Sequence, residues 1–381
     1  YFSIYNISLI DSYFESISGF TSTGFTIFEN IKHLDQSLIL WRSTSQWIGG
    51  VYFLFSIILL IDIFDKNLKN SLTNFLSFNS SEFIKQLIKI LILYVFLTFV
   101  IYIFLKIINF RDFDAFNFAL TIISSGGFKP VNDLNLLLNK DYKVLVFSIL
   151  ILLSFFSIFF IYNLILFKNR DKNFFYEDYN LLLYVIVLVL VFLLFFGYNN
   201  DFINIIFSIF SSISNIGISL NNEFINLQFI FLLLVIIGGS FFSTSSGLRF
   251  IRIYSLIKFS LNQILSFSKP RNIFMNRLLF SKKNFEINEI NKYFLSIIIF
   301  IISLLVLTSL LAFSGIDFER CLKISILTLM NTVNSSIYGI DDFDFQNINY
   351  FTKYSLILFM IVGRIELLTL LLIIKKYLFK N

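Results

Sequence analysis

Long apolar runs separated by polar segments dominate the chain. They lie near 37–61, 83–108, 142–167, 179–197, 225–239, 291–313 and 351–374. Most are long enough to cross a hydrocarbon core of about 30 Å, which takes about 20 helical residues. The run at 225–239 is short, and a polar glycine-serine stretch separates it from another apolar stretch at 248–267. This pattern predicts one interrupted span, whose freed backbone must lie against protein or a water-filled cavity.

The segments between the runs are of two alternating kinds. Three connections are basic and plain, at 62–82, 167–178 and 268–290. Four are longer and carry a short amphipathic run followed by small polar residues, at 9–36, 109–140, 198–224 and 314–349. The plain connections, the stretch after the interruption and the C-terminus hold about 19 of the 30 Lys and Arg residues, which places them on the cytoplasmic side.

The four longer connections share a core, which predicts an internal repeat. The cores are SGFTSTGFT (18–26), TIISSGGFK (121–129), SSISNIGIS (211–219) and LMNTVNSSI (329–337), aligned on Gly24, Gly126, Gly217 and Asn334. We therefore predict an all-α polytopic membrane protein with four linked units of span, re-entrant pore loop and span around one pore. The predicted units are 1–62, 82–167, 178–267 and 290–378. The first lacks its leading span, so we expect an incomplete N-terminus.

Glycine and small polar residues at these cores indicate a cation pathway. Glycine allows positive φ and close backbone approach. Short helices that end in extended stretches aim backbone carbonyls at a common axis, and carbonyl rings replace the hydration shell of a monovalent cation. Each helix also points its negative C-terminal end toward that ion. Ordinary polar turns are the alternative for a single core, and fourfold recurrence disfavours it.

The serine-rich loop, defined as 238–247, interrupts the sixth run. Its small and hydroxyl residues do not continue a helix favourably. We interpret it as a flexible loop that obstructs the pore below the filter, with a loose kink between helices as the alternative. Arg249 and Arg252 are more simply read as cytoplasmic anchors. Arg364 lies inside the last run beside Glu366, and a charge in a membrane usually faces a cavity or a partner. It is either an electrostatic barrier at the pore or half of a structural ion pair.

Composition limits the remaining classes. Of the 381 residues, 57% are hydrophobic and 14% charged, against about 25% charged in soluble domains. This excludes a soluble protein, a disordered chain and a collagen-like fibre. One Cys and one His leave little room for disulfides, His-based metal sites or nucleophile chemistry. The net charge of +6 comes from residues between apolar runs, so membrane topology explains it better than nucleic acid does.

Four motifs together resemble one known family. TSTGFT (21–26), WRSTSQWIGG (41–50), GGSFFSTSSGLRFIR (238–252) and GRIELLTLL (363–371) are similar to the TrkH/KtrB potassium-uptake subunits of the Trk/Ktr/HKT superfamily. The resemblance implies a multi-pass protein of the bacterial inner membrane that transports K⁺ and is not an enzyme. It also implies a homodimer and a cytoplasmic regulatory ring of TrkA/KtrA type, which binds the nucleotide. The chain itself shows no phosphate-binding loop, so we expect no cofactor in it beyond K⁺ at the filter.

The resemblance also assigns positions. By position the selectivity filter carries over to Ser22, Thr23, Gly24, Phe25, Ser125, Gly126, Gly127, Asn215, Ile216, Gly217, Thr332, Val333 and Asn334. The gate carries over to Gly238, Gly239, Ser240, Ser243, Thr244, Ser245, Ser246, Gly247 and the pore arginine Arg364. Asn334 departs from the family because it stands where glycine is usual, although asparagine tolerates positive φ. In the loop, Phe241 and Phe242 replace smaller residues, and Ser245 and Ser246 replace glycines.

Several functions stay open on the sequence alone. A Na⁺-selective or Na⁺/H⁺-coupled cation transporter and a non-conducting relative fit the same fold. A different secondary transporter predicts paired broken helices in two halves, whereas only one span here is clearly broken. An intramembrane enzyme needs a nucleophile-base pair, a metal cluster or paired carboxylates, and the sequence offers none within the spans.

Overall fold

The computed structural model describes residues 1, 7–28, 30–64, 83–166, 175–196, 202–220, 225–267 and 287–365. The described helices are α2 (Leu9–Phe20), α3 (Gln36–Phe64), α5 (Phe83–Ile107), α6 (Asp112–Ile123), α7 (Asp141–Leu153), α8 (Ile158–Ile165), α9 (Tyr176–Phe196), α10 (Phe202–Ile213), α11 (Gln228–Ile236), α12 (Phe250–Ser266), α13 (Ile287–Ala312), α14 (Phe318–Leu329) and α15 (Tyr350–Ile365). In the described part the strands are β1 (Ile237–Gly238) and β2 (Leu248–Arg249), paired in parallel. The predicted all-α fold class is confirmed.

Within the described residues, three helices carry segments that are long and apolar enough to cross a membrane. These segments are Ile84–Ile107, Tyr176–Phe196 and Glu289–Ala312, in α5, α9 and α13. Only 33%, 28% and 33% of their most apolar windows are buried inside the protein. Because such apolar surface is too large to face water, these helices are suited to contact lipid.

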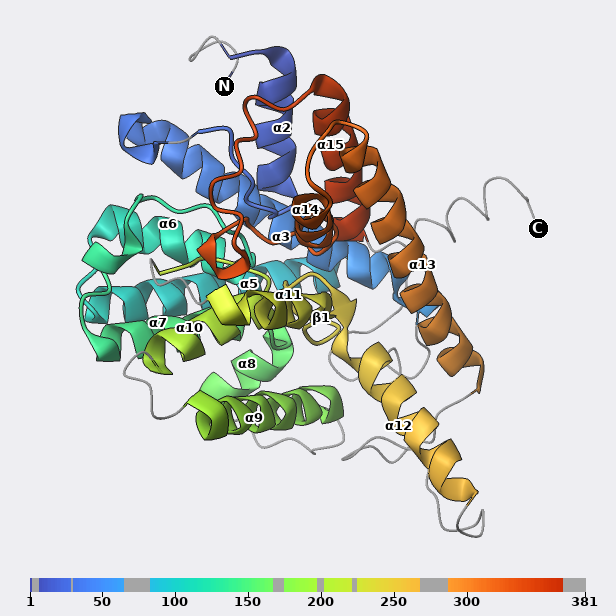
Figure 1. The fold of residues 1–381 in the computed structure, drawn as a ribbon. Coiled ribbons are helices and arrows are strands. Elements are labelled where there is room, and N and C mark those ends of the chain that lie inside the picture. Colours follow the sequence, from blue (N-terminus) through green and yellow to red (C-terminus); the bar gives the residue numbers. More distant parts are fainter. Residues whose placement is uncertain are drawn as a thin grey trace.

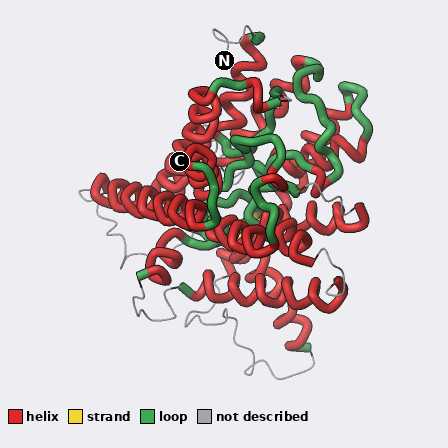
Figure 2. The backbone as a smooth tube through the Cα atoms, turned by 90° about the vertical axis from the view of Figure 1, so that its left-hand side faces the viewer, coloured by secondary structure: helices red, strands yellow, loops and turns green. Residues whose placement is uncertain are grey.

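Four helices of equal length reach into the molecule between the longer ones. They are α2, α6, α10 and α14, each of twelve residues. Each packs against two neighbouring helices: α2 on α3 and α15, α6 on α5 and α3, α10 on α7 and α11, and α14 on α13 and α15. In Figure 1 these helices surround a common centre, and Figure 2 shows loop segments running through the middle of the helical assembly.

The run at 142–167 is not one continuous span, which corrects the prediction of a single broken span. Helix α7 ends at Leu153 and α8 begins at Ile158. The break meets the serine-rich loop: Ser240 N donates to Phe155 O at 3.1 Å, and Ile158 N donates to Phe242 O at 3.2 Å. The two interruptions therefore supply hydrogen-bond partners for each other, which satisfies backbone polar groups that are buried away from water.

Several predicted regions fall partly outside the described residues. They include the connections at 62–82, 167–178, 198–224 and 268–290 and the end of the fourth unit beyond 365, which includes Glu366. The predicted unit boundaries stay a prediction.

Candidate functional site

The four twelve-residue helices end in the same backbone motif. The residues Ser22, Ser125, Asn215 and Asn331 have φ of 56°, 56°, 59° and 47°. The next N–H in each segment then bonds back five residues, as when Thr23 N donates to Ser18 O at 3.0 Å and Thr332 N to Leu327 O at 2.9 Å. This is the left-handed cap that closes a helix C-terminus. Asparagine adopts it readily, while serine does so at a cost of roughly 1–2 kcal/mol.

The shared motif corrects the alignment of the cores by one residue in two segments. Thr23, Gly126, Ile216 and Thr332 make the equivalent backward hydrogen bonds. The position after them is Gly24, Gly127, Gly217 and Val333. Gly126 and Asn334 were aligned with Gly24 because residue type was matched rather than backbone position. The fourth glycine is therefore replaced by Val333. Asn334 lies one position further on, outside the positive-φ set, and donates from Nδ2 to Ile340 O at 3.2 Å.

Hydrogen bonds and close packing join the four segments into a ring. The Ser125 hydroxyl of the second segment donates to Ser214 O of the third. Asn215 Nδ2 of the third donates to Thr332 Oγ1 of the fourth at 3.3 Å. Asn331 Nδ2 of the fourth then donates to Thr23 Oγ1 of the first at 2.9 Å.

The first and second segments meet at glycine. A Cβ atom on Gly24 would lie 3.0 Å from the Cα of Gly127. The predicted filter residues therefore come together in space, and their role in ion binding stays a prediction.

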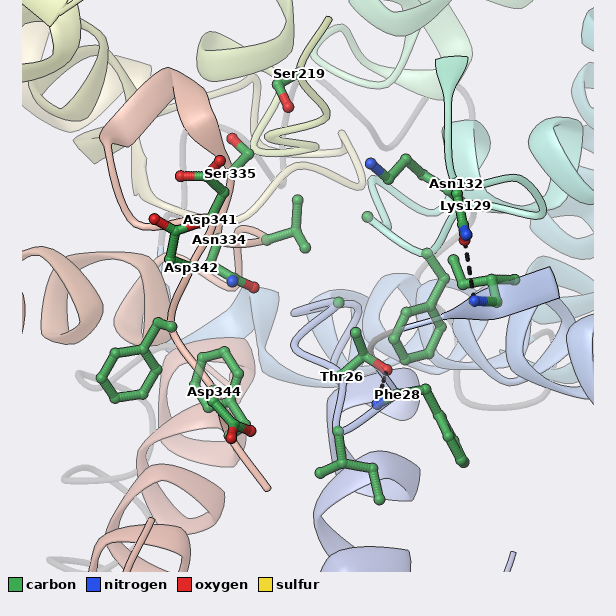
Figure 3. Close-up of a pocket in the computed structure, with 18 of the residues that line it drawn as sticks. Thr26, Phe28, Lys129, Asn132, Ser219, Asn334, Ser335, Asp341, Asp342 and Asp344 are labelled. Carbon is green, nitrogen blue, oxygen red and sulfur yellow. Dashed lines mark hydrogen bonds between the residues drawn. The ribbon is translucent and has the colours of Figure 1, made fainter. Parts of the chain in front are cut away.

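An outer cavity of about 560 Å³ opens on one side of the ring. Gly24, Gly127 and Val333 form part of its floor, and its walls carry Asp341, Asp342, Asp344, Lys129, Asn132 and Arg42. In the close-up, Lys129 and Asn132 lie across the cavity from Asp341 and Asp342 (Figure 3). The acidic residues that follow the fourth core thus line the approach to the ring, where their charge favours cations.

Lys129 opposes that charge in the same cavity. Burial lowers the pKa of its amine below the ordinary value of 10.5, and the nearby carboxylates of Asp133 and Asp341 raise that pKa in part. The lysine therefore loses its charge at a lower pH than a solvated lysine does.

A buried ion pair bonds to the residues that follow the first segment. Arg42 Nη2 lies 2.9 Å from Glu15 Oε1, and the two side chains are 2% and 0% exposed. Glu15 Oε2 accepts from Ile27 N at 3.0 Å, and Arg42 donates to Thr26 Oγ1 at 2.9 Å. The Arg42 guanidinium also lies 4.1 Å from the centre of the Phe128 ring. This pair therefore fixes the exit of the first segment against the second.

The serine-rich loop supplies none of the residues that line the outer cavity. All of its residues except Gly247 are buried. Its hydroxyl groups bond locally: Gly239 N donates to Ser245 Oγ at 3.0 Å, and the Ser243 and Ser245 hydroxyls lie 2.9 Å apart. Gly247 takes a φ of 89°, and a Cβ there would lie 2.9 Å from the Cα of Gly238. Glycine is therefore required where the loop closes on itself.

Arg249 organises this loop and is not a surface anchor, which corrects the sequence interpretation. Its side chain is 1% exposed. Its Nη1 donates to Ser240 O at 2.9 Å, to Ser243 Oγ at 3.3 Å and to Ser245 O at 3.2 Å. Arg252, at 5% exposed, is likewise buried. The loop is thus wound around a buried cation and is not a loose kink.

Arg364 connects the loop to the ring. Its Nη1 donates to Ser246 Oγ at 2.8 Å and to Thr244 O at 3.3 Å. Its Nη2 lies 3.3 Å from Ser22 Oγ and 3.4 Å from Ser124 O. Arg364 thus contacts both the filter cores and the loop, and its predicted role as an electrostatic barrier at the pore stays a prediction.

Two carboxylates at the start of α9 hold both interruptions. Glu177 Oε1 accepts from Phe241 N in the serine-rich loop at 2.9 Å, and Asp178 Oδ1 accepts from Ser157 N in the α7–α8 break at 2.9 Å. Both side chains are buried. The sequence interpretation missed them. The signal was present, since EDYN opens an otherwise apolar run and charged residues at such a position seek partners.

Gln46 was also missed. It is fully buried in α3, and its Oε1 accepts from Phe128 N at 3.4 Å. A Cβ on Gly126 would lie 2.2 Å from that oxygen, so this glycine makes room for the glutamine. In the described part of the chain, no group of three or more His, Cys, Asp and Glu side chains is placed to hold a metal ion.

Known proteins resemble this chain in sequence, although no family model matches it. An uncharacterized cation transporter of Methanocaldococcus jannaschii is 27% identical over 286 residues, which cover 71% of this chain and 57% of that protein. The Trk system potassium uptake protein TrkH of Escherichia coli K12 is 23% identical over 389 residues, covering 97% of this chain and 79% of that protein.

The fold has a solved counterpart. The crystal structure of the potassium transporter TrkH from Vibrio parahaemolyticus superposes with a TM-score of 0.78 at 20% identity, covering 96% of this chain and 78% of that one. In the archaeal case the chain spans just over half of its relative's length. In sequence and in fold, the chain is similar to the TrkH potassium uptake proteins.

Proposed function

We propose that the chain is the pore-forming membrane subunit of an uptake system for K⁺, located in a bacterial inner membrane. The observation that carries the proposal is the ring of four helix-capping segments that meet at Gly24, Gly127, Gly217 and Val333. Four helix C-termini directed at one site favour a cation, and backbone carbonyls there can replace its hydration shell. The relatives are named as a cation transporter and as potassium uptake proteins, which agrees with this assignment.

In this proposal the serine-rich loop is the gate. It lies on the inner side of the ring, and Arg364 ties it to Ser22. A cation leaving the ring meets the positive charges of Arg249 and Arg364 in a site with little water, where charge repulsion is strong. Movement of the loop, to which Arg249 and Arg364 donate hydrogen bonds, would open the path below the ring.

The subunit would act with partners. The relatives are named as parts of a Trk system, so we expect a second copy of the chain and a cytoplasmic TrkA/KtrA-type ring that binds the nucleotide. Lipid would cover the apolar faces of α5, α9 and α13.

Growth rescue tests the function directly. The full-length gene is expressed, together with its regulatory partner, in a bacterium that lacks K⁺ uptake, and growth in limiting K⁺ is paired with uptake of radiolabelled Rb⁺ and Na⁺. Rescue with Rb⁺ uptake supports the proposal. Na⁺ uptake without rescue contradicts the ion assignment, and no uptake of either ion by protein verified in the membrane contradicts the pore itself.

Two glycine variants test the site. Gly24 and Gly315 both have positive φ, of 81° and 83°, but only Gly24 faces the ring, whereas nothing lies within 4 Å of a Cβ on Gly315. Both Gly24→Ala and Gly315→Ala place a side chain in a left-handed backbone at a cost of roughly 1–2 kcal/mol. We expect Gly24→Ala to abolish Rb⁺ uptake and Gly315→Ala to keep it. Equal uptake by the two variants would contradict the assigned site.

A further inference from the structure

Val333 occupies the space that three glycines leave in the ring. A Cβ on Gly127 would lie 2.4 Å from Val333 Cβ and 2.8 Å from Val333 Cγ1. A Cβ on Gly24 would lie 3.1 Å from Val333 Cβ, and a Cβ on Gly217 would lie 3.1 Å from Val333 Cγ1. The isopropyl group therefore borders all three equivalent residues at once. It is 8% exposed, and it also borders the outer cavity.

The chemistry of this group does not suit a bare cation. An ion that gives up its water needs oxygen ligands around it, and a ring of carbonyls supplies them. The isopropyl group offers no oxygen, and it takes volume at the level where the other three segments present only backbone. A β-branched side chain is also stiff at χ1, so it does not swing aside as a long flexible side chain does.

The backbone of Val333 differs as well. Its equivalents Gly24 and Gly217 have φ of 81° and 71°, whereas Val333 is not among the positive-φ residues. A β-branched residue at positive φ is a strong outlier. Gly127, although it is a glycine, is not among the positive-φ residues either, so at this position the second and fourth segments differ in backbone conformation from the first and third.

On these grounds we propose that Val333 is the specificity- and rate-determining residue of the pore. Its side chain narrows the ring at the outer cavity and removes one side of the oxygen cage. K⁺ and Rb⁺, which need the complete cage, are held back more than Na⁺. The inference rests on the proposed function, since it assumes that cations pass through the ring.

Four variants of the full-length protein in proteoliposomes test it. Val333→Gly removes the constriction and Val333→Ala reduces it. Val333→Thr keeps the branched shape. Val131→Gly makes the same chemical change in the outer loop, away from the ring. Size-exclusion profiles and thermal midpoints check folding, and initial uptake of Rb⁺ and Na⁺ is measured against equal protein.

We expect Val333→Gly to raise Rb⁺ uptake about tenfold, equivalent to about 1.4 kcal/mol of barrier, and to raise the ratio of Rb⁺ to Na⁺ uptake. Val333→Ala should fall between it and the parent. Val333→Thr, which keeps the bulk but adds a hydroxyl oxygen, should raise Rb⁺ uptake less than Val333→Gly does, and Val131→Gly should match the parent. If the parent conducts and folded Val333→Gly shows the same uptake and ratio, the inference is overturned while the proposed function stands. If no folded variant conducts with the regulatory partner present, both are overturned.

Discussion

Arg364 donates a hydrogen bond to the hydroxyl of Ser246 at 2.8 Å, which ties the last helix to the serine-rich loop. The same guanidinium lies 4.4 Å from the centre of the Phe53 ring. The centre of the Phe53 ring also lies 5.1 Å from the guanidinium of Arg249, so one aromatic ring contacts both buried arginines that donate to the loop. The serine-rich loop, the ring of four segments and helix α3 are therefore linked through Arg364 and Phe53.

We predict that Arg364→Gln raises Rb⁺ uptake and lowers the thermal midpoint. A hydrogen bond to a charged group contributes about 1.5–3 kcal/mol, and its loss frees the loop while removing a positive charge from the path. Uptake in proteoliposomes and melting in detergent measure the two effects. Lys323→Gln, which breaks only the ion pair with the exposed Glu319, serves as the control and should change neither. A stable Arg364→Gln protein with unchanged uptake would contradict the gate.

The two acids of α9 give a second prediction. Glu177→Gln keeps an oxygen that can accept from Phe241 N, whereas Glu177→Ala removes this acceptor from a buried site. Losing the partner of a buried donor costs about 1–3 kcal/mol. We expect the alanine variant to melt at a clearly lower temperature and the glutamine variant to remain close to the parent. Equal melting of both variants would mean that Glu177 does not hold the loop through this bond.

The buried pair behind the first segment predicts a non-additive response. Glu15→Leu leaves Arg42 charged and unpaired, and breaking a buried pair this way costs about 3–5 kcal/mol. The double variant Glu15→Leu/Arg42→Met should recover part of the lost thermal stability, because it removes the stranded charge. Uptake should not recover, since Thr26 and Ile27 have lost their partners. Additive losses in the double variant would show that the two residues act separately.

Lys129 predicts a dependence on external pH. Its pKa is lowered by burial, so its positive charge fades as the outside pH rises through that value. The cavity, lined by Asp341 and Asp342, then attracts cations more strongly, and uptake should rise. Lys129→Gln should give higher uptake at neutral pH, by about fivefold if the charge contributes about 1 kcal/mol, and a flatter pH profile. Lys143→Gln, an outer lysine that is not among the residues lining the cavity, should behave as the parent does.

The sequence predicted the existence of the four cores better than their register. Residue type marked Gly24 and Gly217 correctly because both have positive φ. Residue type misplaced the second core because either of the adjacent glycines at 126–127 can be aligned with Gly24. It misplaced the fourth core because the equivalent residue there, Val333, is not a glycine. Only the backward hydrogen bonds fix which residue follows the cap.

The α7–α8 break could not be seen in the sequence. Residues 151–160 are apolar apart from Ser154 and Ser157, so hydropathy predicts a continuous helix. The break is stabilised by partners distant in sequence, namely Phe242 O and the Asp178 carboxylate. Arg249 was misjudged for a similar reason, since its three acceptors belong to a loop whose winding is decided only in three dimensions.

A single chain supplies all four sides of the ring, and this affects how the width of the opening can change in evolution. In a pore of four identical chains, a single codon change alters every side together, so intermediate widths are not accessible. Here a change at position 333 alters one quarter and leaves Gly24, Gly127 and Gly217 in place. The opening can therefore be adjusted in steps, one side at a time, without passing through a fully blocked form.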